Sequence, residues 1–288
     1  MSDSVHPAPE RLPGPRVWIV GAGPGAPDLL TLRAARAIER AEVLVVTDSL
    51  VNPQIIALAP PGCECIRTST LTLEELMALV VERAEAGLRV VRLHDGDPCL
   101  YGALAEQICC LADAGIGVEV VPGISAYQAT AAALQTELTV PGLVQTIVLS
   151  RVGGRTGVPA SESLARLAAL RASLCLYLSA RHVEEVQAEL LQHYPAETPV
   201  AIGYRVSWPD QWLTVVPLSE MAQASRERAL IRTTLYVVSP ALAPPEQARS
   251  RLYSPSHRHL FRGGAPEDGP PDSSASAGRA RSAATPAD

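Results

Sequence analysis

The stretch HDGDPCLYGALAEQ, residues 94–107, decides how this chain folds. It follows an apolar run typical of a strand and leads into a helical pattern, so a loop is expected between the two elements. Gly96 removes side-chain bulk from that loop, and Pro98 fixes φ and has no N–H to donate. Asp95 and Asp97 place two carboxylates at the carboxyl end of the strand. Open α/β sheets bind ligands outside such strand ends, and the stretch therefore predicts a ligand-binding loop.

Strand and helix patterns alternate on both sides of this loop. The first half predicts strands at residues 16–20, 42–46, 63–67 and 89–93, and helices at residues 29–41, 72–86 and 103–114. Such alternation favours parallel strand pairs joined by right-handed crossovers. In the second half the later strands follow one another without long helices, which predicts a mixed sheet. The expected fold class is α/β, with two α/β domains, the first sheet mostly parallel and the second mixed.

The chain of 288 residues exceeds one typical domain. Its periodic pattern pauses at TVPGL, residues 139–143, which we interpret as a linker between an N-terminal domain of residues 16–138 and a C-terminal domain of residues 144–240. Residues 1–15 contain four prolines and no periodicity, and they are expected to form a flexible arm. Residues 241–288 are rich in Pro, Ser, Ala, Gly and Arg, and we expect this tail to be largely disordered.

Composition narrows the possible function classes. The formal net charge of −6 argues against nucleic acid as a partner, and all 24 basic residues are arginine, which excludes a lysine Schiff base and a P-loop lysine. No apolar run approaches the roughly 18 residues of a membrane span, and the first residues contain no apolar signal core, so no membrane association and a cytoplasmic location are expected. The six cysteines show no CxxC pair and no histidine at zinc spacing. We predict no metal site and interpret the cysteines as small buried residues in a reducing compartment.

A glycine-rich loop offers a first functional hypothesis. GAGPGA, residues 21–26, follows a strand and satisfies GxGxxA, and Asp48 ends the next strand about 20 residues later, where a dinucleotide-binding fold keeps its ribose acid. Against this hypothesis, Pro27 pushes Ala26 out of the helical region, so the helix starts too late to bind a pyrophosphate with its N–H groups. A tight turn without a ligand is the plain alternative. A dinucleotide-dependent oxidoreductase is kept as a rival from another class.

Three motifs occur together in the first half: GAGPGAPDLLT at residues 21–31, DGDPCLYGAL at residues 95–104 and PGISA at residues 122–126. In this order and at these spacings they resemble the tetrapyrrole methylases, a family that uses S-adenosyl-L-methionine in cobalamin and sirohaem synthesis. The resemblance covers residues 16–240. The second half, above all RVSWPDQ at residues 205–211, is similar to the precorrin-4 C-11 methyltransferases within the family. The resemblance implies a cofactor cleft between the two domains, a tetrapyrrole substrate and a homodimer.

Carried over position by position, the resemblance implies which residues hold the cofactor. One comes from the first loop, four from the second, two from the PGISA turn and two from the second domain: Pro24; Asp95, Gly96, Asp97 and Leu100; Ser125 and Ala126; Leu178 and Val206. A carboxylate and backbone carbonyls suit a cationic sulfonium better than an anion-binding helix end does. The role of Asp95 stays open at this point, because its carboxylate either contacts the cofactor or faces water.

The acceptor of a tetrapyrrole methylase carries several carboxylates, which calls for arginine side chains. Arg151 and Arg155, in a glycine-containing loop after a strand, are the candidates for substrate binding, and the alternative for each is a surface ion pair. Trp208 either stacks on the macrocycle or forms a rigid turn with the proline that follows it. Asp48 is the candidate catalytic base, and a loop-capping role is its alternative.

The resemblance therefore implies transfer of a methyl group from S-adenosyl-L-methionine to C-11 of precorrin-4, which gives precorrin-5. Methyl transfer from sulfur to carbon is an in-line displacement, so the protein has only to align the reactants and exclude water. The alternatives are a cobalt-precorrin-4 methyltransferase of the anaerobic route, the dinucleotide-dependent oxidoreductase and a non-catalytic cofactor sensor.

Overall fold

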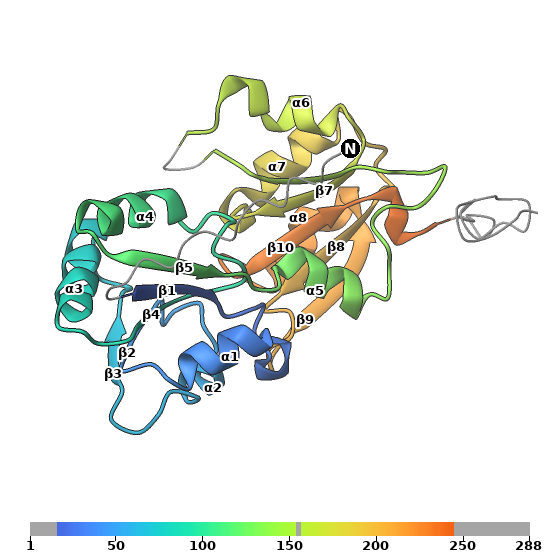
Figure 1. Cartoon of the computed structure of the whole chain (residues 1–288). Coiled ribbons are helices and arrows are strands. Elements are labelled where there is room, and N and C mark those ends of the chain that lie inside the picture. The colour runs from blue at the N-terminus through green and yellow to red at the C-terminus, as the bar shows by residue number, and fades with distance from the viewer. Residues whose placement is uncertain (1–15, 154–156, 245–288) are drawn as a thin grey trace, which may run out of the picture.

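Two five-stranded sheets organise residues 16–153 and 157–244, the part of the chain that the computed structural model describes (Figure 1). The first sheet has the strand order β3-β2-β4-β1-β5, and every pair of neighbouring strands in it is parallel. Its strands are β1 (Arg16–Gly21), β2 (Val43–Val46), β3 (Glu64–Arg67), β4 (Val90–His94) and β5 (Gly117–Val121). The predicted parallel pairing is confirmed.

Helices cover both faces of this sheet (Figure 1). One face carries α1 (Leu32–Ile38) and α2 (Pro53–Ile56), and the other carries α3 (Leu73–Glu85) and α4 (Leu104–Asp113). The sequence of α3 begins with a capping box, in which Thr72 Oγ1 accepts from Glu75 N at 3.2 Å and Glu75 Oε2 accepts from Thr72 N at 2.8 Å. Because helices lie on both faces, the inner strands are buried on both sides, which explains the continuous apolar sequence VLVV of β2.

A topological switch point lies between β1 and β4. These two strands are neighbours, yet β1 leads to α1 on one face of the sheet and β4 leads to α4 on the other. Open α/β sheets bind ligands at the carboxyl ends of strands that meet at such a point. The two loops within residues 21–26 and 94–107 both begin at this point.

The second sheet is mixed, as predicted, with the order β6-β7-β10-β8-β9. Only β6 and β7 pair in parallel within it. Its strands are β6 (Ile147–Arg151), β7 (Ser173–Tyr177), β8 (Pro199–Tyr204), β9 (Trp212–Pro217) and β10 (Thr234–Val238). One face is covered by α6 (Leu164–Ala168), α7 (Val183–Leu190) and α8 (Met221–Glu227).

The other face of the second sheet is covered by α5 (Ala126–Ala133). Tyr127 and Ala131 of this helix pack against Cys175, Ala201 and Leu235 of the sheet. The helix follows β5 of the first sheet, so the chain crosses between the two sheets immediately before it. The predicted domain limits at residues 138 and 144 stay a prediction.

Short 3-10 helices complete the described elements: η1 (Pro27–Leu29), η2 (Ala160–Glu162), η3 (Ala180–His182), η4 (Leu218–Glu220) and η5 (Pro240–Leu242). None of the helices within residues 16–153 and 157–244 is long and apolar enough to cross a membrane. The predicted arm of residues 1–15, Arg155 and most of the predicted tail of residues 241–288 lie outside the described residues.

Two expectations from the sequence were wrong in detail. The helix expected from residue 29 begins only at Leu32, because the chain first makes the 3-10 turn η1 and Thr31 then caps the helix, with its Oγ1 accepting from Ala34 N at 3.1 Å. The cysteines are mostly not buried: Cys175 is, whereas Cys65, Cys99, Cys109 and Cys110 are exposed. The two in α4 lie away from the buried side of that helix, which carries Gln107 and Leu111.

Candidate active site

Three glycine-containing loops meet at the switch point. They begin at the ends of β1, β4 and β5, where Gly21, the last residue of β1, meets Gly96 and Gly123 in one contact. A Cβ atom added to Gly123 would lie 2.1 Å from the carbonyl oxygen of Gly96 and 2.9 Å from the Cα of Gly21. A Cβ atom added to Gly21 would lie 2.6 Å from the nitrogen of Gly123. No side chain fits between these backbones, so the three sequence motifs need their glycines for close mutual approach.

Backbone hydrogen bonds join the first two loops. Ala22 N donates to His94 O at 2.7 Å, Gly23 N donates to Gly96 O at 3.1 Å, and Gly96 N donates to Gly23 O at 2.9 Å. Both glycines have positive φ, 70° and 59°, which only glycine adopts without strain. A loop that binds a pyrophosphate keeps its N–H groups for the phosphate oxygens. Here Ala22 and Gly23 use theirs inside the protein, which argues against the dinucleotide hypothesis.

Asp97 fastens the second loop to the third. Its Oδ1 accepts from Cys99 N at 2.8 Å, and its Oδ2 accepts from Gly123 N at 2.9 Å. The first bond closes a local Asx turn, and the second reaches the PGISA turn. Since both carboxylate oxygens bind backbone N–H groups, Asp97 determines the shape of the loop. Its contact with a cofactor stays a prediction.

A loop of the second sheet closes over the first glycine loop. Trp208 Nε1 donates to Pro24 O at 3.0 Å, and Ala26 N donates to Ser207 Oγ at 3.0 Å. These bonds hold the two domains together at one end of the crevice. They also use the N–H of Ala26, which a phosphate-binding turn would need.

The indole of Trp208 is enclosed on several sides. A Cβ atom added to Gly25 would lie 2.2 Å from Trp208 Cδ1, so the ring lies directly on that glycine. The guanidinium of Arg205 covers the ring at 3.9 Å from its centroid, and Trp208 is only 8% exposed. The structure gives Trp208 a packing role between the domains, and its stacking on a macrocycle stays a prediction.

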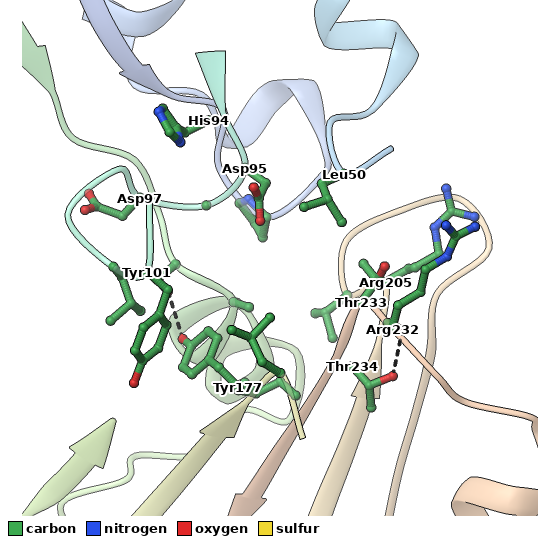
Figure 2. A pocket seen from close by; sticks show the side chains of 18 of the residues that line it. Leu50, His94, Asp95, Asp97, Tyr101, Tyr177, Arg205, Arg232, Thr233 and Thr234 are labelled. Carbon is green, nitrogen blue, oxygen red and sulfur yellow. Dashed lines mark hydrogen bonds between the residues drawn. The ribbon is translucent and has the colours of Figure 1, made fainter. Parts of the chain in front are cut away.

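A cavity of about 610 Å³ lies between the two domains and is bounded by these loops (Figure 2). Its volume is in the range of small-molecule sites. All nine residues predicted to hold the cofactor line it, and so does Trp208: Pro24, Asp95, Gly96, Asp97, Leu100, Ser125, Ala126, Leu178 and Val206. The fold thus brings residues from both halves of the chain to one cavity. That they bind a cofactor stays a prediction.

Strained backbone is concentrated around this cavity. Nine non-glycine residues of the described chain have positive φ, and five of them line the cavity. These five are Tyr101 (56°), Ala103 (49°), Leu178 (55°), Arg205 (46°) and Thr233 (54°). Backbone of this kind costs about 1–3 kcal/mol per residue and gathers at ligand sites. Five of these nine residues line the cavity, which makes it the candidate functional site.

Asp95 lies on the cavity wall with an accessible side chain (Figure 2). The protein on both sides displaces much of its hydration, and this loss raises the pKa of its carboxyl, while its own backbone N–H and the charge of Arg92 act in the opposite direction. A carboxylate in such a recess attracts a cation more strongly than one on an open surface does. Asp95 lines the cavity, and its contact with a cofactor stays a prediction.

Arg92 is a buried cation on the lining of this cavity, and the sequence did not predict it as a site residue. It is 6% exposed, and its guanidinium donates to Val45 O at 3.3 Å, Leu93 O at 3.1 Å and Thr47 Oγ1 at 3.1 Å. Loss of hydration lowers the pKa of Arg92 to about 10, and Asp95 opposes that shift, so the group stays charged at neutral pH. The sequence does place an arginine inside a predicted strand. The strand pattern alone does not show that this strand is buried on both faces.

His94 is a packed, uncharged histidine at the end of β4. Its Nε2 lies 3.4 Å from the side-chain amide of Gln107, whose Nε2 donates to Gly102 O at 2.8 Å. Burial, followed by the charge of Arg92, lowers the pKa of His94 to about 4, and the Gln107 contact acts in the opposite direction. The ring is therefore neutral at pH 7.

We expect His94 to make the fold less stable as the pH falls from about 6.5 to 4. The unfolded histidine takes up a proton in this window and the folded one does not, so the free energy of unfolding decreases, by up to about 3 kcal/mol. Thermal unfolding between pH 7.5 and 4.5 checks this. His94→Gln, which cannot be protonated, should flatten the dependence, and His182→Gln at an exposed position is the control. An unchanged slope in His94→Gln would contradict the assignment.

The predicted base and the predicted acceptor arginines are not among the cavity-lining residues. Asp48 follows Thr47, which does line the cavity, and its buried Oδ1 has no hydrogen-bond partner among the described residues. Arg151 ends β6, and its Nη2 donates to Gly157 O at 2.9 Å. Arg155 lies outside the described residues. The roles of all three stay predictions.

The fold and the site together define a class of protein. It has two α/β domains, a parallel first sheet, and a cavity where the carboxyl ends of that sheet meet the second domain (Figure 1, Figure 2). The family model for tetrapyrrole (corrin/porphyrin) methylases matches residues 16–222, and the chain belongs to this family.

Similar proteins support this membership over most of the chain. The precorrin-4 C(11)-methyltransferase of Pseudomonas aeruginosa is 42% identical over 248 residues, which cover 86% of this chain and 99% of that protein. The cobalt-precorrin-4 C(11)-methyltransferase of Priestia megaterium is 37% identical and covers 86% and 98% of the two chains. A solved cobalt precorrin-4 methyltransferase superposes with a TM-score of 0.77 at 36% identity, covering 80% of this chain and 96% of its own. These relatives give no support to a dinucleotide-dependent oxidoreductase.

Proposed function

We propose that the protein transfers a methyl group from S-adenosyl-L-methionine to C-11 of precorrin-4, giving precorrin-5 and S-adenosylhomocysteine in cobalamin biosynthesis. The observation that carries the proposal is the 37% to 42% identity with precorrin-4 and cobalt-precorrin-4 C(11)-methyltransferases along nearly their whole length. The cavity at the switch point supports it, because it is the only described feature that brings all the cofactor candidates together.

The residues of the cavity fit S-adenosyl-L-methionine. Asp95 offers a carboxylate to the sulfonium and ammonium charges, and Leu178, which is 69% exposed, offers an apolar surface to the adenine base. A solved uroporphyrin-III C-methyltransferase from Thermus thermophilus, 29% identical with a TM-score of 0.67, is a complex with S-adenosylhomocysteine. When bound, the cofactor supplies a methyl group that is already activated on a cationic sulfur.

The chain itself then aligns the reactants and excludes water. The contact among Gly21, Gly96 and Gly123 fixes the loops that carry the cofactor candidates. The hydrogen bond from Trp208 to Pro24 O keeps the second domain against the first loop. Asp48 is the proposed base for the proton lost after methylation, and its buried, unpartnered oxygen is the observation in favour of that role.

We expect the double substitution Arg151→Ala and Arg155→Ala to weaken acceptor binding about tenfold or more and to leave the affinity for S-adenosylhomocysteine unchanged. The reason is the loss of charged hydrogen bonds to substrate carboxylates, each equivalent to about 1.5–3 kcal/mol. The KM for the acceptor and calorimetry with S-adenosylhomocysteine measure the two effects. Arg40→Ala, at an exposed arginine between α1 and β2, is the control for loss of an arginine elsewhere on the protein. Equal loss of both affinities would point to misfolding instead.

Two measurements test the proposed reaction. Incubation with precorrin-4 and S-adenosyl-L-methionine should raise the acceptor mass by one methyl group, and the same assay with cobalt-precorrin-4 decides between the metal-free and the cobalt-loaded substrate. Calorimetry should detect S-adenosylhomocysteine and not NADH. Binding of NADH without S-adenosylhomocysteine would refute the proposal, and cofactor binding without turnover would favour a sensor. A homodimer and a cytoplasmic location complete the proposal.

A further inference from the structure

Tyr101 is held in an unfavourable backbone conformation on the cavity wall. Its φ of 56° lies in the left-handed region, which bulky side chains rarely adopt. The turn that follows is tightly packed, because a Cβ atom added to Gly102 would lie 2.6 Å from Pro98 O, and Ala103 is also left-handed. Tyr101 is nevertheless 44% exposed, so burial of its ring does not offset the strain. Strain that the fold does not need is a reason to look for a function.

The ring of Tyr101 rests on a second tyrosine that is fixed in place. The centroids of Tyr101 and Tyr177 are 5.6 Å apart and their planes are tilted by 54° (Figure 2). Tyr177 ends β7, and its hydroxyl lies 2.8 Å from Ser125 Oγ and accepts from Tyr127 N at 3.2 Å. The two rings therefore form one aromatic wall, with Tyr101 contributed by the first domain and Tyr177 by the second.

Charged groups lie around the outer edge of this wall. Loss of hydration raises the pKa of the Tyr101 phenol, while the positive charge of Arg151 lowers it and the negative charge of Glu162 raises it. Arg151 is the register partner of Tyr177 on the neighbouring strand, so the end of β6 lies beside this wall. An exposed ring beside a cation is suited to a ligand that is flat, conjugated and anionic.

We propose that Tyr101 is an acceptor-binding residue, whose ring stacks on a conjugated ring of the substrate while Arg151 lies toward the substrate's carboxylates. The inference rests on the proposed function and deepens it, because it assigns the two tyrosine rings of the cavity lining to the acceptor. The left-handed turn is explained as the means of presenting the ring to the cavity instead of to the core.

Equilibrium titration with uroporphyrin III, a flat tetrapyrrole polycarboxylate, tests the inference in the full-length protein. Tyr101→Asn should raise the Kd for uroporphyrin III at least tenfold and change that for S-adenosylhomocysteine by less than twofold. Its thermal midpoint should stay equal or rise, because asparagine tolerates the left-handed region. Tyr101→Phe keeps the ring and should stay within threefold of the wild type. Gln135→Asn, at a left-handed residue outside the cavity lining, is the matched control.

An unchanged affinity of Tyr101→Asn for uroporphyrin III would overturn the inference, and an equal loss in Tyr101→Phe would assign the effect to the hydroxyl instead of the ring. Methylation of precorrin-4 is followed in parallel to separate the two proposals. If uroporphyrin III binding depends on Tyr101 but the wild type does not methylate precorrin-4, the proposed reaction is rejected and the inference about Tyr101 is kept. Methylation by Tyr101→Asn with an unchanged KM for precorrin-4 would reject the inference about Tyr101 and keep the proposed reaction. If the wild type does not bind uroporphyrin III, the KM of Tyr101→Asn decides.

Discussion

Replacing Gly123 with alanine is expected to weaken cofactor binding strongly and to destabilise the fold. The added Cβ would lie 2.1 Å from Gly96 O and 2.9 Å from the Cα of Gly21. Both are backbone atoms, which cannot turn aside as the end of a side chain can. Overpacking of an interior typically costs about 1–3 kcal/mol, and a backbone clash belongs at the upper end of that range. To relieve it, the loops after β1, β4 and β5 must separate, and these loops form the first-domain wall of the cavity.

Calorimetry with S-adenosylhomocysteine and thermal unfolding measure the two consequences. We expect an affinity at least about 30-fold lower, equivalent to about 2 kcal/mol, and a midpoint lower by about 5–10 °C. Gly157→Ala makes the same chemical change where φ is not left-handed and the space around the new Cβ is open, so it should behave as the wild type. Wild-type affinity in Gly123→Ala would show that the contact of the three glycines is not needed.

Asp97→Ala is expected to lower both the stability of the fold and the affinity for the cofactor. The substitution removes both acceptors from the N–H groups of Cys99 and Gly123, and hydrogen bonds to a charged group contribute about 1.5–3 kcal/mol each. Because Asp97 is partly accessible, water replaces some of this loss, and we expect about 3 kcal/mol in total. The loop then loses its attachment to the PGISA turn, so that Asp95 and Ser125 no longer keep their relative positions.

We expect the thermal midpoint of Asp97→Ala to fall by about 6–12 °C and its affinity for S-adenosylhomocysteine to fall at least tenfold. The thermal midpoint and the affinity of Asp97→Asn should lie between those of the wild type and Asp97→Ala. Its amide oxygen still accepts one hydrogen bond, while its NH₂ group faces another donor. Asp113→Ala removes an exposed carboxylate from the end of α4 and is the control. A large loss of affinity with no loss of stability would instead favour direct contact between Asp97 and the cofactor.

Much of the fold was predictable because its signals are local. The apolar runs gave β1, β2 and β4 to within one residue, and the Thr72 and Glu75 capping box gave the start of α3. The predicted start of α1 was less accurate. Pro27 is compatible both with the first turn of a helix and with the 3-10 turn that the chain adopts. The exposure of Cys109 and Cys110 was missed, because the residue type alone does not tell which side of α4 faces the sheet.

The candidate site was also predictable only in part. Motif glycines and prolines identified the loops after β1, β4 and β5, and their predicted residues line one cavity. The residues that the sequence did not reveal act through partners far away in the chain. Arg92 is recognisable only once β2 lies beside β4, and Tyr177 only once α5 brings Ser125 and Tyr127 to its hydroxyl.

By itself, the sequence determined the α/β class, the alternation that makes the first sheet parallel, and the three loops with their glycines, because each depends on neighbours within a few residues. Only the tertiary structure decided what these loops do to one another. Contacts between distant segments bring Gly21, Gly96 and Gly123 together. Such contacts also join Asp97 to the third loop and place Trp208 over Gly25. The physical reason is that close packing is a property of atoms in space, and a one-dimensional pattern records which residues allow it but not which partners they meet.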